Sequence, residues 1–102
     1  MKIKKITSAL WPVNVPISAD GGVTEDEKIW VRFEKIPSKD EAEWAQKPIL
    51  DLLRHVVKGL GETQESVKAD AELLEEALEE EHYTFAMYNA YLDFKQGIAA
   101  KN

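Results

Sequence analysis

The 102-residue chain contains no cysteine, so it has neither a disulfide framework nor a thiolate metal site. It also lacks any apolar run approaching the ~20 residues that a membrane-spanning helix needs. The basic start at residues 1–6 is not followed by the apolar stretch of a signal peptide, because Pro12, Asn14 and Pro16 interrupt it. These absences predict a soluble protein of the cytoplasm, where disulfides are rare.

Clustered positive charge is scarce as well. The net charge is −6, and the one small basic group is formed by Lys2, Lys4 and Lys5. Binding to nucleic acid needs clustered lysine and arginine that displace counterions from phosphates. Acidic surfaces repel both nucleic acid and anionic membranes. The charge therefore favours a protein or small-molecule partner over a nucleic acid or a membrane.

Motifs of catalysis are missing too. The chain has no nucleophile elbow, no phosphate-binding glycine loop and no HExxH sequence. The spacing of Glu79 and His82 matches one half of a carboxylate-bridged di-iron site, but such a site needs a second copy on another helix. The other histidine, His55, lies beside an apolar stripe and is expected at the surface. The sequence predicts no enzyme activity, no metal and no cofactor.

A run of glutamates lies in the C-terminal half, at Glu75, Glu76, Glu79, Glu80 and Glu81. Such a run could mimic a nucleic-acid backbone or collect divalent cations. Alternation with leucines is more typical of the solvated side of an amphipathic helix.

The N-terminal third has the alternation of β-strands. Apolar residues recur at every second position at Trp11, Val13, Val15 and Ile17, and again at Ile29, Val31 and Phe33. This period places them on one face of each strand. The Gly21-Gly22 pair predicts a turn between the strands, and prolines in the first strand predict an edge position. A further strand at Ile3 to Ile6 would complete a small antiparallel sheet.

Helical periodicity begins after Pro37. Ser38 and Glu41 have the spacing of a capping box that starts a short helix with Trp44 directed inward. A second helix is expected from Pro48, with Gly59 and Gly61 as its end. Its apolar stripe consists of Ile49, Leu52, Leu53, Val56, Val57 and Leu60.

Two more helices should follow a polar loop at residues 62–68. One starts at Asp70 and carries a stripe of Leu73, Leu74, Ala77 and Leu78. The last runs from near Thr84 to Gln96, with Gly97 as its stop. The fold class is therefore α+β: one domain over residues 1–102, with a β-rich part at 1–37, a helical part at 38–97 and a tail at 98–102.

Four residues are candidates for contact with a protein partner. Trp30 shares its strand face with Lys28 and Arg32, and tryptophan and arginine are frequent at interfaces. In the last helix the apolar positions lie on several sides of the cylinder, which suggests that one side meets a partner. That side is assigned to Met87, Tyr91 and Phe94. The alternative is that these three fill the core.

Three stretches resemble the small tail assembly chaperones of long-tailed phages and prophages. The first is the strand at 11–17 with its glycine turn. The second is the segment Ile29-Trp30-Val31-Arg32-Phe33-Glu34-Lys35-Ile36 with the glutamate-rich helix after it. The third is the helical remainder, with Val57-Lys58-Gly59-Leu60, Asp70-Ala71-Glu72-Leu73-Leu74, Tyr88-Asn89-Ala90-Tyr91 and the ending Gly97-Ile98-Ala99-Ala100-Lys101-Asn102.

The resemblance implies a chaperone that coats the tape measure protein in the bacterial host cytoplasm. It leaves before the virion is complete, and in some relatives a longer form also recruits the tail tube protein. A structural or connector protein of the tail has a similar size and style and is the first alternative. An acidic inhibitor that mimics DNA is the second. The apolar surface is also compatible with a homo-oligomer.

Overall fold

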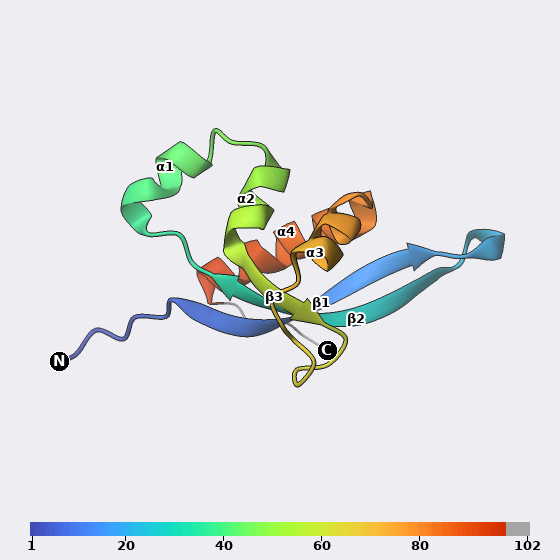
Figure 1. Cartoon of the computed structure of the whole chain (residues 1–102), viewed down its shortest axis with the longest axis horizontal. Coiled ribbons are helices and arrows are strands. Elements are labelled where there is room, and N and C mark those ends of the chain that lie inside the picture. The colour runs from blue at the N-terminus through green and yellow to red at the C-terminus, as the bar shows by residue number, and fades with distance from the viewer. Residues whose placement is uncertain (98–102) are drawn as a thin grey trace.

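A computed structural model, which describes residues 1–97, shows an α+β domain with a three-stranded antiparallel sheet in the order β1-β2-β3. The α-helices gather on one side of this sheet (Figure 1). The strands are β1 (Ser8–Ser18), β2 (Thr24–Glu34) and β3 (Val57–Gly61), and the helices are η1 (Asp20–Gly22), η2 (Ser38–Asp40), α1 (Glu41–Trp44), α2 (Ile49–Val56), α3 (Ala71–Leu78) and α4 (Glu81–Gln96).

The expected hairpin is confirmed. β1 and β2 pair from Ser8 opposite Glu34 to Ser18 opposite Thr24, without a break in register. The turn contains Gly21 and Gly22, both with a φ of 78°, a conformation that glycine adopts without a steric penalty. Since β1 pairs only with β2 among the described residues, its prolines lie on an edge strand as predicted.

The expected strand at Ile3 to Ile6 is absent, because residues 1–7 form no strand. The third strand comes instead from Val57–Gly61, which pairs with β2. This segment was expected to be the end of a helix, but α2 ends at Val56. By periodicity alone, a short apolar run fits either a helix or a buried strand. Here the segment forms a strand because it pairs with β2.

Gly59 and Gly61 therefore lie within β3 and do not end a helix. The loop after β3 folds back against them, and Leu60 bridges to Lys68. A Cβ on Gly61 would lie 2.6 Å from Ser66 Oγ, so the close approach of this loop requires glycine.

The helix starts differ from expectation in two places. The capping box of Ser38 and Glu41 does not form, because Ser38 begins a 3₁₀ turn and makes no side-chain cap. α4 begins at Glu81, three residues before Thr84. Asp70 does cap α3, and its carboxylate accepts a hydrogen bond from Leu73 N–H at 3.0 Å. Gly97 ends α4 with a φ of 73° as predicted, while the expected tail at 98–102 lies outside the described residues.

The core lies between the sheet and the helices. β2 contributes Ile29, Val31 and Phe33, which alternate toward the helices. Three aromatic rings meet at the centre: Phe33 lies 5.6 Å from Tyr91 and 5.8 Å from Phe94, measured between ring centroids. Such distances are typical of packed aromatic pairs.

Candidate protein-binding surface

The two histidines do not form a reactive site. His55 is exposed and stacks on Trp44, with 4.3 Å between the ring centroids. His82 belongs to the first turn of α4, whereas Glu79 caps the end of α3, so the two do not share a helix face. Within residues 1–97, no group of three or more histidine, aspartate or glutamate side chains could hold a metal ion. None of the helices formed by these residues is long and apolar enough to cross a membrane.

The three contact candidates of α4 lie in the core. Met87 is fully buried, and Tyr91 and Phe94 are 2% and 6% exposed. Phe94 also packs edge to face against Trp11, with 5.7 Å between the centroids. The three residues thus fill the core, which was the alternative to a contact role. In this fold they offer almost no surface to a partner.

Trp30 lies on the other face of the sheet and is half-buried between neighbouring strands. Its partners in register are Pro12 on β1 and Gly61 on β3, neither of which has a long side chain. The Lys28 ammonium sits over its ring, 5.2 Å from the centroid. Trp30 is therefore the one predicted contact residue that lies on a face without helices.

Phe85 is the aromatic residue of α4 that remains exposed, with 54% of its surface accessible. It adjoins a shallow apolar hollow of about 330 Å³ between α4 and the start of α2, where Leu50 is 37% exposed. Phe85 was not among the contact residues predicted from the sequence, although it is one of the apolar positions that surround the last helix. Its exposure could have been predicted from helical spacing. The side of α4 that packs on the sheet carries Thr84, Met87, Tyr91 and Phe94, and Phe85 does not belong to this stripe.

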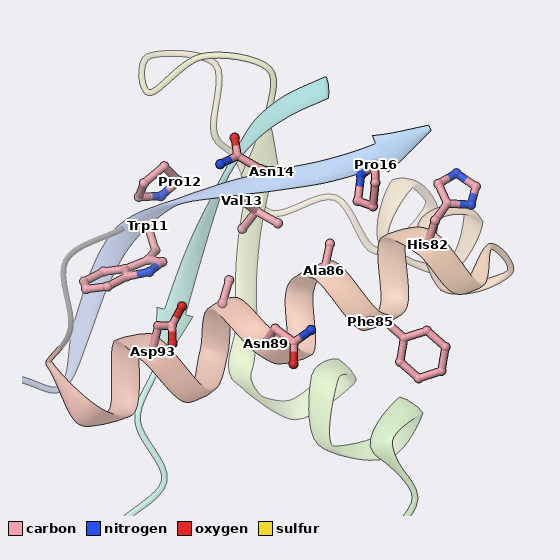
Figure 2. Close-up of a pocket in the computed structure, with 11 residues that line it drawn as sticks. Trp11, Pro12, Val13, Asn14, Pro16, His82, Phe85, Ala86, Asn89 and Asp93 are labelled. Atoms are coloured by element: carbon pink, nitrogen blue, oxygen red, sulfur yellow. The ribbon is translucent and has the colours of Figure 1, made fainter. Parts of the chain in front are cut away.

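A groove of about 420 Å³ runs on the other side of Phe85, between β1 and α4. Figure 2 shows Trp11 and Val13 directed from β1 toward the helix, whereas Phe85 points away from the strand. The helix lines the groove with His82, Phe85, Ala86, Asn89, Ala90 and Asp93. The buried Trp11 Nε1 has no hydrogen-bond acceptor among the described residues. The groove thus combines small apolar positions with a few polar groups.

The free edge of β1 borders this groove. Backbone hydrogen bonds at the two ends of the hairpin run from Ala19 N–H to Val23 O and from Lys35 N–H to Thr7 O. The backbone N–H and C=O groups of odd-numbered β1 residues therefore point toward β2. The backbone groups of even-numbered residues point to the open edge of the sheet, and there Pro12 and Pro16 have no N–H to donate. Because two donors are missing, the edge is a poor template for an added strand.

Comparison with known proteins adds no relative: no family model, no curated protein and no solved structure matches the chain.

Proposed function

We propose that this domain is a non-enzymatic chaperone of phage tail assembly, which binds apolar helical segments of the tape measure protein. The observation that carries the proposal is the exposed Phe85, located between the β1–α4 groove and the apolar hollow at α2. Large aromatic side chains dominate binding energy at protein interfaces. Continuous apolar surface of this kind on a small domain is typical of a site for a partner.

The groove favours a helical cargo over an extended one. An extended peptide gains its affinity from backbone hydrogen bonds along a strand edge, and the prolines of β1 remove two donors there. A helix instead inserts side chains spaced three and four residues apart into an apolar groove. The small residues Ala86 and Ala90 leave room for such side chains, and Phe85 adds an exposed aromatic ring at the margin of the groove. The net charge of −6 would keep the loaded complex in solution.

Co-expression with tiled fragments of the tape measure protein from the same phage or prophage tests the proposal. We expect the wild-type chain to raise the soluble yield of apolar fragments and to co-purify with them. Phe85→Ser should weaken this binding by about 30-fold, since loss of a central aromatic contact costs about 2 kcal/mol or more. Its melting temperature should stay close to that of the wild type because the side chain is exposed.

Val23→Ser is the matched control, because Val23 is 55% exposed and lies at the far end of the hairpin. It should retain every fragment. If the wild-type chain neither solubilises nor retains any fragment, the chaperone proposal is wrong. Mass spectrometry of purified virions separates it from the structural alternative, since a tail or connector protein stays in the particle and a chaperone does not.

A further inference from the structure

A second hollow, of about 450 Å³, lies between the sheet and the junction of α3 with α4. Its floor is apolar: Ile29 and Leu60 are almost completely buried, and Ala77 lies beside them. Leu73 stands at the side with 40% of its surface exposed. Leu73 belongs to the predicted apolar stripe with Leu74, and it faces this hollow. The volume suffices for a few side chains of a ligand.

The rim of this hollow is strongly acidic. Five carboxylates line it, from Glu27, Glu62, Glu76, Glu79 and Glu80, and no lysine or arginine is among its lining residues. The ion pairs between described residues use other carboxylates, those of Glu41, Glu43, Asp51 and Glu75. We call this hollow the acidic groove. Its apolar floor and negative rim match a ligand that combines apolar side chains with cations.

Tyr83 reports the electrostatics of the acidic groove. Its hydroxyl donates a hydrogen bond of 2.9 Å to Glu27. Burial raises the pKa of the Tyr83 hydroxyl, and the hydrogen bond to Glu27 and the charges of Glu27 and Glu62 raise it further. A positive charge bound here would offset this accumulation of negative charge.

The chain itself carries a segment of the required chemistry. Residues 1–6, here called the N-terminal arm, alternate three lysines with apolar side chains. Ile3 and Ile6 are 72% and 65% exposed, although isoleucine is a residue that is usually buried. The arm has no regular structure and extends beyond the end of the sheet (Figure 1), where Lys4, Lys5 and Ile6 line an open hollow with residues 35–38.

The arm cannot place both of its isoleucines in the acidic groove of its own chain. It joins the sheet at Ser8, which pairs with Glu34 at one end of β2. Ile29, on the floor of the groove, lies five residues further along β2, or about 17 Å away. Ile6 is only two residues before Ser8, which allows a reach of about 7 Å. Ile6 therefore stays outside the groove of the same chain.

We propose that the N-terminal arm of one copy docks in the acidic groove of a second copy of this chain. An extended arm with three residues per turn places Ile3 and Ile6 on the same side, about 9 Å apart. These two side chains then cover Leu73 and the apolar floor, while Lys4 and Lys5 meet the glutamates of the rim. The contact is short, so the association should be weak, in the micromolar range, and should weaken further with salt.

Charge exchange tests the contact by sedimentation velocity of the full chain over a range of concentrations. Lys4→Glu with Lys5→Glu should raise the dissociation constant about tenfold, and Glu76→Lys with Glu80→Lys should do the same. All four substitutions in one chain should restore association, because both surfaces are then reversed together. This charge-swapped chain keeps the wild-type net charge of −6.

Two exposed lysines outside both surfaces provide the control. Lys39→Glu with Lys58→Glu changes the net charge as much as the arm variant does, yet it should leave association unchanged. A wild-type chain that stays monomeric overturns the proposal, even when the groove captures a basic segment of some other protein. Four substitutions that do not restore association overturn it as well.

Cross-linking locates the contact independently, because the chain has no cysteine of its own. An Ile3→Cys chain mixed with a Leu73→Cys chain should form a disulfide-linked dimer under mild oxidation. Ile3→Cys mixed with Val23→Cys should form far less, although Val23 is more exposed than Leu73. Equal yields would overturn the proposal. The inference is independent of the chaperone function, since Phe85→Ser should leave the association intact.

Discussion

The two faces of the sheet share one strand but differ in what holds them. On β2, Val31 and Phe33 point to the helices and are completely buried. Their neighbour Trp30 points to the opposite face, where its closest support is a lysine and two residues without long side chains. One face is therefore stabilised by tight packing between layers. The other face depends on local contacts between strands and one loop. Alternation along a strand therefore decides to which face a side chain points, but not what packs against that face.

The largest effect should come from the helix-covered face. Phe33→Ala removes a ring that contacts both Tyr91 and Phe94, and it leaves a cavity that the sheet and α4 cannot close. We expect a loss of about 3–5 kcal/mol in the free energy of unfolding. Urea denaturation followed by tryptophan fluorescence measures this loss. A cost below 1 kcal/mol would mean that the aromatic cluster is not the centre of the core.

The loop on the opposite face gives the second test. Gly61→Ala places a methyl group against Ser66, where both the side chain and the backbone lie closer than a Cβ tolerates. The loop must shift, and overpacking of this kind costs about 1–3 kcal/mol. Lys58→Ala, at an exposed position of the same strand, is the control and should cost little. Equal stability of the two variants would show that the loop does not pack on β3.

Trp30→Ala compares the faces directly. The ring is half-buried, so its loss should cost about 1–2 kcal/mol, clearly less than the loss from Phe33→Ala, three residues further along β2. Melting curves of both variants, recorded in one buffer, give the ranking. A reversed order would mean that the face without helices carries more of the stability than its packing indicates.

The smallest effect should come from an ion pair between two of the helices that cover the sheet. Arg54 on α2 donates two hydrogen bonds to Glu75 on α3, at 2.8 and 2.9 Å. The hydrogen bond from Arg54 lowers the pKa of Glu75 below its ordinary value. A lowered pKa in the folded state stabilises the fold above the pKa of the unfolded chain, and this contribution is lost as the pH falls through the folded value.

Wild type and Glu75→Gln should therefore differ slightly near pH 7 and converge under acidic conditions. Both groups are exposed, so the difference should be small and should shrink in high salt. Denaturation midpoints measured between neutral and strongly acidic pH give the two curves. If the two curves stayed parallel over the whole pH range, the Arg54–Glu75 pair would not contribute to the pH dependence of stability.

Much of the fold was predictable from local pattern. The hairpin follows from alternation on both strands and from two glycines in the turn. α3 follows from Asp70 as its cap and α4 ends where Gly97 permits a left-handed residue. The expected sheet strand at Ile3 to Ile6 was wrong, since an apolar–basic alternation does not by itself supply a hydrogen-bonded partner strand. The start of α4 at Glu81 was missed because no capping side chain marks it.

The candidate site was harder to predict. The aromatic residues of α4 have similar hydrophobicity, so hydrophobicity by itself does not separate buried Phe94 from exposed Phe85. The spacing Met87, Ala90, Tyr91 and Phe94 does hold the signal for the packed side. The acidic groove had no such signal, because its floor and rim come from four separate elements.

The sequence alone determined the elements that depend on neighbours along the chain: two strands by period 2, helices by period 3.6, and turns by glycine. Tertiary structure decided what depends on distant residues. Val57–Gly61 became a strand because β2 offered an unpaired edge, and glycines expected to end a helix instead admit a loop. Residues far apart in the chain meet only after packing fixes their layers, so no local pattern can specify the surfaces they form.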